Sequence, residues 1–396
     1  MKTNILTITA ICATMLACNS KNEITNRVEL PGTVDNEAFA ANVESISVMN
    51  LQMDDKWSLA GGQLLAFADN YTYLLESNQR ILICFDKLTG EIIKTRSING
   101  NGPGEIIYIN SMFCIGDTLC IYDIKGNILQ YDQNCTFLGK MHEFEDSGLS
   151  YYKLLRLNSG DYALISPFSF STDTISTIFL TDEQFNIKSR HFKSPQFKMV
   201  LQSGNANPYY VNNDTIRFIY PYDNNIYSLY GDTEQRIELM LPNPMTVQTA
   251  GDPDFLSKFT EYDGWFNELS ESGRFILFKY RINNVEHISM LDKRAYNAVS
   301  ISNIGFISKK CSSDIISTLL KYINILQTDG KYIYARYRNC DLANLLEGHD
   351  DILDTRLKKT QAEYRAYLER NAEYVKSLEP EERDAANVIL KIKLKD

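Results

Sequence analysis

The sequence lacks an excess of positive charge, and this absence excludes one large class of function. Its 40 Lys and Arg residues are outnumbered by 50 Asp and Glu residues, which gives a net charge of −10. A protein that binds nucleic acid needs a basic surface to meet the phosphates, so the charge balance argues against nucleic acid as a partner. The acidic excess favours solubility but does not by itself select another partner.

Catalytic and metal-binding signatures are also missing. No Gly-x-Ser-x-Gly segment supplies the exposed nucleophile of a serine hydrolase, and no Cys-x-x-Cys pair suggests a zinc site. His349 stands in EGHDDILD, where a metal site is conceivable, but the charge run is more typical of a solvated helix start. No two of the four histidines lie within four residues of each other: His142, His191, His287 and His349. The sequence therefore predicts neither a metal site nor a catalytic residue.

The N-terminus has no hydrophobic run long enough to cross a bilayer, but it carries a targeting pattern. Lys2 is followed by an apolar stretch from Ile5 to Leu16, which is too short for a membrane span and fits a secretory signal. Leu16-Ala17-Cys18 then precedes the polar segment NSKNE. This resembles the lipobox of bacterial lipoproteins, which implies lipidation of Cys18; the alternative is an ordinary signal with a chance cysteine. We expect a signal peptide over residues 1–17 and a lipid-anchored tether and lead-in over residues 18–42.

The cysteines do not form a recognisable disulfide framework. Cys114 and Cys120 flank a turn at Gly116-Asp117, and in that register their sulfur atoms point to opposite faces of the sheet. An exported protein is permitted disulfides, but buried free thiols that act as small hydrophobic groups are the favoured interpretation. Six cysteines follow Cys18: Cys84, Cys114, Cys120, Cys135, Cys311 and Cys340.

A repeated unit of about 40 residues dominates the rest of the chain. Residues 78–105 contain a strand, a turn, a second strand and a glycine-rich link, and the pattern returns in GNILQYDQNCTFLGKMHEF. Self-similarity at such a period is typical of repeat architectures. The strand ILICFD is apolar on both of its alternating faces, whereas a sheet with one wet face would alternate apolar with polar residues. A strand buried on both sides fits a propeller blade between two neighbours.

Six units of this kind can be traced between about residue 51 and the C-terminus. Residues 242–262 form a long link that suits a helical turn. The sixth unit is interrupted by residues 341–383, whose apolar residues recur at helical spacing, and then returns to the strand NVILKIKLK. This unit is one strand short, and residues 44–51 can supply it, which would close the ring and remove exposed sheet edges. The prediction is an all-β, six-bladed β-propeller over residues 43–396, with a C-terminal helical insert and closure by the N-terminal strand.

The first unit carries the most specific resemblance. The strand ending in Phe-Asp, the turn Thr-Gly-x-Ile and the segment Gly-x-Gly-Pro-Gly-Glu are similar to NHL-type repeats. With the lipobox and the final ILKIKLK, the chain resembles the six-bladed β-propeller lipoproteins of Gram-negative bacteria in the TolB-like superfamily. This resemblance implies the fold and a location in the cell envelope, with the outer membrane as the preferred site of anchoring. Some related propellers are lactonases with a divalent cation in the channel, but their ligand set does not map onto this chain residue by residue.

The glycine-rich segment and several tyrosine pairs are the remaining candidates for a site. The glycine segment is followed by strand-like residues, whereas a dinucleotide loop must open a helix. It is therefore interpreted as a turn between blades one and two, built from Gly100, Gly102, Pro103, Gly104 and Glu105. Glu105 is expected to begin the innermost strand of blade two, where it would face the channel or bind the amides of this turn. The tyrosines would stack on a ligand or pack between blades: Tyr151, Tyr152, Tyr209, Tyr210, Tyr220 and Tyr222.

These observations favour a binding protein over an enzyme. The preferred hypothesis is a membrane-tethered envelope lipoprotein that acts as a binding or scaffold propeller for a glycan, a peptide or an envelope protein. It rests on analogy at the level of the fold and on the missing catalytic motifs, because propellers host many unrelated functions. The alternative is a metal-dependent hydrolase or lyase, similar to a lactonase, with a divalent cation held by oxygen ligands in the channel.

Overall fold

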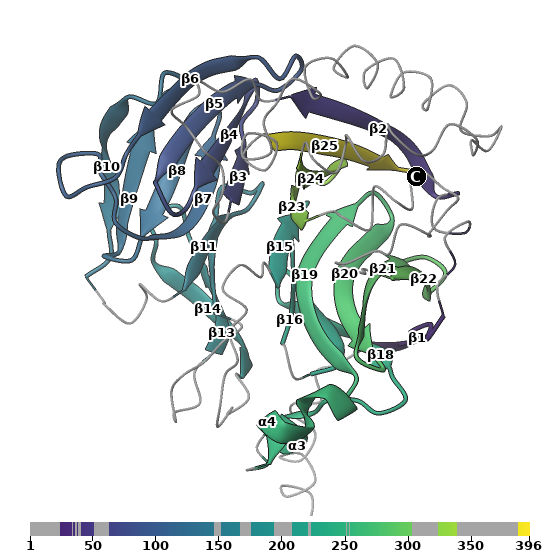
Figure 1. The fold of residues 1–396 in the computed structure, drawn as a ribbon. Helices are drawn as coiled ribbons and strands as arrows, with labels where there is room; N and C mark the ends of the chain where they lie inside the picture. The colour runs from purple at the N-terminus through teal and green to yellow at the C-terminus, as the bar shows by residue number, and fades with distance from the viewer. Residues whose placement is uncertain are drawn as a thin grey trace, which may run out of the picture.

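The computed structural model shows six sheets arranged as the blades of a ring, each built on four antiparallel strands, with a fifth strand added in parallel to one of them (Figure 1). The first strand of each blade contacts the first strand of the next, so these six strands form the inner wall. The structure describes residues 24–33, 35, 38, 41–50, 63–145, 152–166, 176–193, 208–220, 223–250, 252, 254–302, 324–338 and 387–396. The predicted six-bladed propeller is confirmed.

Blades one to three follow one another from residue 63. Blade one contains β3 (Gln63–Phe67), β4 (Tyr71–Glu76), β5 (Ile81–Asp86) and β6 (Ile92–Ser97). Blade two contains β7 (Ile109–Ile115), β8 (Thr118–Asp123), β9 (Asn127–Tyr131) and β10 (Phe137–Glu143). Blade three contains β11 (Lys153–Arg156), β12 (Tyr162–Ile165), β13 (Ser176–Thr181) and β14 (Ile187–Lys193).

Blades four and six each receive a strand from the N-terminal region. Blade four contains β15 (Tyr209–Asn212), β16 (Thr215–Ile219), β17 (Asn225–Tyr230) and β18 (Thr233–Met240), with β1 (Ile24–Glu29) outside β18. Blade five contains β19 (Gly264–Ser272), β20 (Phe275–Ile282), β21 (Val285–Asp292) and β22 (Asn297–Ser302). Blade six contains β23 (Asn324–Thr328), β24 (Tyr332–Arg338), β25 (Asn387–Leu394) and, outermost, β2 (Val43–Asn50).

The hydrophobic core consists of layers between neighbouring blades. In β5, every residue from Ile81 to Phe85 is buried. The two faces of β5 belong to different core layers. Leu82 and Cys84 pack toward blade two. Ile81, Ile83 and Phe85 pack toward blade six. The strand is apolar on both faces because each face is covered by another sheet, as the sequence predicted.

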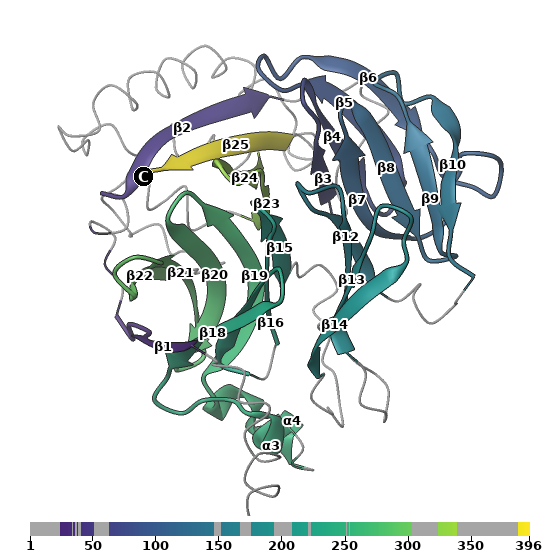
Figure 2. The ribbon, with the colours of Figure 1, turned by 180° about the vertical axis from the view of Figure 1, so that it is seen from behind.

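The ring closes through β2, as predicted. This strand pairs antiparallel with β25, with Val48 opposite Leu390, so the two ends of the chain share one blade. Figure 2 shows both strands together at the edge of blade six. The predicted helical insert over residues 341–383 lies outside the described residues.

The strand β1 lies within the tether and lead-in expected over residues 18–42. It pairs parallel with β18, with Ile24 opposite Gln235 and Val28 opposite Leu239. The buried side chains of Val28 and Leu30 join the core between blades four and five. Beyond β1 the chain continues across blade five, where Tyr280 donates its hydroxyl to the carbonyl of Pro31 at 2.7 Å. The described residues between Ile24 and Asn50 therefore form a strap across blades four, five and six.

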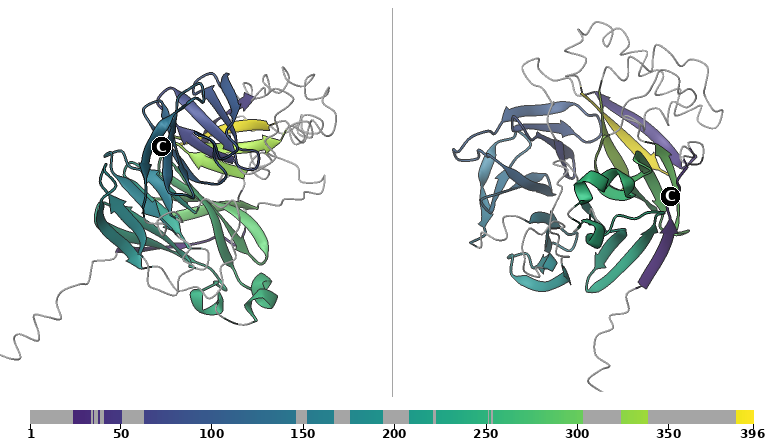
Figure 3. Two further views of the ribbon diagram at one scale, coloured as in Figure 1. Left: turned by 90° about the vertical axis from the view of Figure 1, so that its left-hand side faces the viewer. Right: turned by 60° about the horizontal axis from the view of Figure 1, so that its bottom comes forward.

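The ends of the strands define two faces of the ring. We call the end that carries the turns between first and second strands, and between third and fourth strands, the hairpin face. The opposite end, which carries the links between blades, is the linker face. The link after blade four bears the predicted helical turn as α3 (Val247–Ala250), α4 (Phe255–Lys258) and η2 (Phe259–Glu261). Figure 3 shows α3 and α4 at this end of the ring. Among the described residues, no helix has the length and apolar character needed to cross a membrane.

Candidate functional site: the central channel

The six innermost strands enclose a cavity of about 400 Å³. Its wall includes residues from β3, β7, β11, β15, β19 and β23, so every blade contributes to it. At the hairpin face the cavity reaches Asp69, Gly116 and Asp329, which lie in or next to the first turn of their blades. Its volume lies in the range of small-molecule sites, which is roughly 300–1,000 Å³.

Glu268 is the most distinctive residue on this wall. It lies in the innermost strand of blade five with a φ of 51°, a conformation that is rare for residues other than glycine. The register of β19 on β20 passes from Asn267 opposite Lys279 to Leu269 opposite Phe278, so Glu268 is the extra residue of a β-bulge. Bulges occur next to functional sites because they redirect a side chain.

The carboxylate of Glu268 is held by a buried lysine. Lys279 on β20 lies 2.9 Å from both carboxylate oxygens, and its side chain is only 5% exposed. Removing two charges from water costs several kcal/mol, and a backbone at positive φ costs about 1–3 kcal/mol. The strand pairing on both sides of the bulge holds this arrangement in place, so Glu268 is presented to the channel in a fixed position.

Positive groups lie elsewhere on the channel wall. Arg156 on β11 has a buried Nε that makes no hydrogen bond within the described part of the chain. Lys87, from the turn after β5, donates a hydrogen bond to the carbonyl of Ala68 at 2.9 Å. Tyr209 supplies an aromatic ring to the wall, and burial raises the pKa of its hydroxyl. The channel therefore offers charges of both signs and an aromatic surface to a polar ligand.

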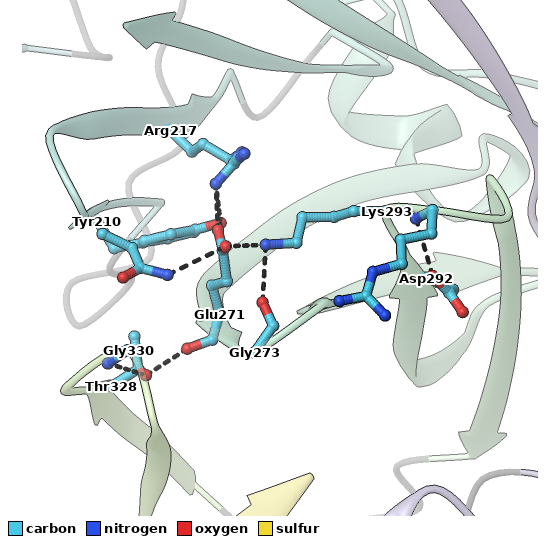
Figure 4. A network of polar contacts seen from close by, with 10 residues as sticks. Tyr210, Arg217, Glu271, Gly273, Asp292, Lys293, Thr328 and Gly330 are labelled. Atoms are coloured by element: carbon cyan, nitrogen blue, oxygen red, sulfur yellow. Dashed lines mark hydrogen bonds and ion pairs between the residues drawn. The ribbon is translucent and has the colours of Figure 1, made fainter. Parts of the chain in front are cut away.

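A buried polar network behind this wall ties three blades together (Figure 4). Glu271 on β19 is 2% exposed and pairs with Arg217 of blade four and with Lys293 of blade five. It also accepts a hydrogen bond from Tyr210, whose pKa is raised by burial and further by this carboxylate. The backbone carbonyl of Glu271 accepts the hydroxyl of Thr328 in blade six. This network positions β15, β19 and β23, which are half of the inner wall.

The hairpin face is locked by further contacts between blades. Asp117 of blade two accepts two hydrogen bonds from Asn70 of blade one, at 2.8 Å from its backbone and 2.7 Å from its side chain. Asp214 of blade four accepts the backbone amide of Ser159 in blade three at 3.1 Å. These contacts fix the mouth of the cavity at this face.

The glycine segment forms the predicted turn between blades, but Glu105 does not reach the channel. Glu105 accepts the backbone amide of Gly102 at 2.8 Å, which is the second of the two roles expected for it. The expectation that it faces the channel is wrong, because the innermost strand begins only at Ile109 and Glu105 is exposed in the link before it. Gly104 has a φ of 73°, which explains the glycine there.

The candidate tyrosines occupy different environments. Tyr152 and Tyr220 are 7% and 2% exposed, so their rings pack between blades and offer no face to a ligand. Among the described candidates, Tyr209 and Tyr210 line the channel, and the hydroxyl of Tyr210 donates to Glu271. Tyr151 and Tyr222 lie outside the described residues, as does Cys18.

The described cysteines and histidines pack within or between blades and form no recognisable site. Cys84, Cys114, Cys120 and Cys135 are free thiols, and Cys114 faces Leu119 in the predicted register. His191 is buried and contacts Glu234 at 3.1 Å, while His142 stacks on Phe185 with a centroid distance of 4.3 Å. Burial lowers the pKa of His287. No group of three or more metal-ligating side chains occurs within the described ranges.

The family of the chain follows from its sequence match. Residues 17–336 match the model of the family DUF5128, which is described as a 6-bladed beta-propeller. The chain belongs to this family. Membership in DUF5128 agrees with the six blades and with the family resemblance of the first repeat unit. No curated protein matches the chain.

Two solved structures share the fold of this DUF5128 member. A protein of Bacteroides fragilis described as exported aligns with a TM-score of 0.66 and 17% identity, covering 94% of this chain and 100% of its own. A duf4221 family member from Bacteroides vulgatus aligns with a TM-score of 0.51 and 8% identity, covering 89% of this chain and 98% of its own. Identities this low establish a shared architecture.

Two features of the site were not predicted from the sequence. The segment GWFNELSES predicts a strand, but nothing in its alternation marks Glu268 as a bulge. The network around Glu271 joins residues from three blades, so it depends on the assembled ring. Glu271 stands between Ser270 and Ser272 in a strand that faces another blade. These neighbouring polar residues were the sign in the sequence of a buried polar contact there.

Proposed function

We propose that this DUF5128 member is an envelope lipoprotein, anchored through Cys18, whose propeller binds a polar ligand at its central channel. The observation that carries the proposal is the cavity of about 400 Å³ into which a strained bulge directs Glu268. The ligand class is a glycan, a peptide or an extended segment of another envelope protein. Each of these offers hydrogen-bonding groups that suit a wall with charges of both signs.

Several features support the envelope location. The N-terminal pattern ends in a cysteine at the point where the apolar run stops. The structural relative from Bacteroides fragilis is described as exported. The free thiols that the structure describes are buried or half-buried, so an oxidising compartment leaves them without accessible partners.

The binding site is tested with the chain from residue 19 onward, produced without its signal. Defined oligosaccharides and short peptides are screened by thermal shift, and each hit is measured by calorimetry. The channel variant is Glu268→Gln with Lys279→Met, which removes both members of the buried pair and so leaves no uncompensated charge. We expect it to weaken binding of a hit at least tenfold.

The control variant removes an ion pair of the same type far from the channel. Arg27→Met with Glu238→Gln eliminates the exposed contact between β1 and β18, whose atoms are 2.8 Å apart. We expect it to bind each hit like the parent chain. A ligand that binds the parent and the channel variant equally would place its site outside the channel and contradict the proposal.

A further inference from the structure

The position of β1 determines where an N-terminal anchor must lie relative to the ring. Ile24 lies opposite Gln235, two residues after β18 begins. The turn that precedes β18 contains Gly231 and Asp232 and belongs to the hairpin face. Because β1 is parallel to β18, the chain enters it from the hairpin face and runs toward the linker face.

The tether between the anchor and β1 is short. Only five residues separate Cys18 from Ile24. A fully extended chain advances at most about 3.6 Å per residue, so the lipidated residue lies within about 22 Å of the start of β1. From the start of β1, opposite Gln235, the end of β18 at Met240 is five residues or about 17 Å away, so the tether would have to fold back along most of its length to bring Cys18 to the linker face.

The start of β1 is fixed on the ring. All six residues of β1 pair with β18, from Ile24 opposite Gln235 to Glu29 opposite Met240. The amide of Leu30 donates to the carbonyl of Met240 at 3.1 Å and extends this register. Val28 and Leu30 are 1% and 3% exposed within the core. The tether is therefore attached at a fixed point, the end of blade four near the hairpin face.

We infer that the anchor holds the hairpin face toward the membrane and leaves the linker face, with α3 and α4, directed away from it. This inference rests on the proposed lipidation of Cys18. It gives the channel a polarity, because the end of the cavity at Asp69, Gly116 and Asp329 then faces the bilayer. A ligand that enters there comes from the membrane side, and a partner that docks on α3 and α4 comes from the opposite side.

The orientation is tested with the full chain, processed in a Gram-negative host and reconstituted into phosphatidylcholine vesicles that contain a lipid-linked energy acceptor. Neutral vesicles avoid repulsion of a protein with a net charge of −10. One donor dye is attached through Asp232→Cys in the hairpin face, where the side chain is 90% exposed. The matched dye is attached through Asp254→Cys before α4, where the side chain is 72% exposed. The unsubstituted chain gives the labelling blank.

We expect energy transfer to the bilayer to be several-fold stronger from residue 232 than from residue 254. Insertion of a Gly-Ser linker of about 20 residues after Glu23 relaxes the constraint and should reduce this difference. Equal transfer from the two sites means that the ring stands on its edge and overturns the inference, as does stronger transfer from residue 254.

Mass spectrometry of the same samples separates this outcome from failure of the anchor. A lipidated N-terminal Cys18 with the reverse order of transfer overturns the orientation and leaves the proposed function intact. A chain without lipid at Cys18, or a Cys18→Ala variant that still fractionates with membranes, overturns the anchor and the orientation together.

Discussion

Glu271 of blade five accepts a hydrogen bond from the side-chain amide of Asn212 in blade four, at 3.1 Å. The same carboxylate compensates the charges of Arg217 and Lys293, so it holds the junction between two blades. We expect Glu271→Gln to lower the free energy of unfolding by about 3–5 kcal/mol, because two partly buried cations lose their counter-charge. Urea denaturation measures the loss.

The control for Glu271 is Glu261→Gln at an exposed position of η2. It removes the same charge and should change stability by less than about 0.5 kcal/mol. Equal urea midpoints for Glu271→Gln and the parent chain would show that the network contributes nothing to the ring.

Deletion of the N-terminal strap should destabilise the protein in two steps. Removal of residues 19–36 eliminates β1, an edge strand, and exposes one side of the core between blades four and five. Removal of residues 19–50 also eliminates β2 and opens the ring, so the larger fall in melting temperature should accompany this second step. Calorimetry compares both chains with the chain from residue 19. If the longer deletion melts like that chain, closure by β2 is not what stabilises the ring.

The turn between blades one and two should not tolerate a side chain at residue 104. The φ of Gly104 is 73°, and a Cβ there would lie 2.5 Å from the Cβ of Phe137. We expect Gly104→Ala to cost roughly 2–4 kcal/mol, from the backbone conformation and from the overlap. Gly32→Ala is the control, because a Cβ at residue 32 would have no neighbour within 4 Å. Chemical denaturation of the two variants should separate them clearly.

Lys153 should make the stability of the protein depend on alkaline pH. Burial lowers the pKa of its ammonium from 10.5 to about 8. Between these values Lys153 is protonated in the unfolded chain but not in the folded chain, so the contribution of this residue to stability rises as pH increases from 8 to 10.5. Lys153→Met should increase stability at pH 7 by up to about 3 kcal/mol, since each pKa unit corresponds to about 1.36 kcal/mol. This gain should shrink as pH increases from 8 to 10.5, because Lys153 is then neutral in the folded parent chain.

Denaturation curves at several pH values test the role of Lys153. Lys94→Met, at an exposed position of β6, provides the control and should leave the pH profile unchanged. The buried thiols and tyrosines with raised pKa are common to Lys153→Met and the parent chain, so the test is the difference between these two chains. If this stability difference does not shrink between pH 8 and 10.5, Lys153 is not desolvated in solution.

Removal of divalent metal distinguishes the binding propeller from a metal-dependent enzyme. Asp329, on the channel wall, already accepts the amides of Lys331 and Tyr332 at 3.0 and 2.7 Å. Glu268 is paired with Lys279. We therefore expect a chelator to leave the melting temperature of the purified protein unchanged. A stoichiometric Ca²⁺ or Zn²⁺ whose removal lowers the melting temperature would favour the hydrolase or lyase alternative.

Local patterns in the sequence predict much of the ring. The two apolar faces of ILICFD require cover on both sides, and the turn at Gly116-Asp117 sets the observed register of Cys114 and Cys120. The missing strand of the sixth unit predicts the pairing of β2 with β25. Each of these inferences depends on alternation within a few residues, which is the signal that a strand leaves in a sequence.

The remainder depends on contacts between distant segments. ITNRVE carries no strong alternation, and it becomes β1 because the edge of β18 is available to it. The channel position expected for Glu105 was wrong because the link before β7 extends four residues further than the pattern suggested. The bulge at Glu268 and the partners of Glu271 are set by three-dimensional packing, which no short window of sequence contains.

The closure of blade six also sets an order for folding. Glu44 and Lys393 lie 349 positions apart and form an ion pair of 2.6 Å across β2 and β25. During synthesis, β2 emerges early and has no partner until β25 follows, whereas blades one to three complete themselves from consecutive segments. Contacts of such sequence separation form late because loop closure must precede them. A chain truncated before Asn387 lacks β25, which leaves β2 unpaired and the ring open.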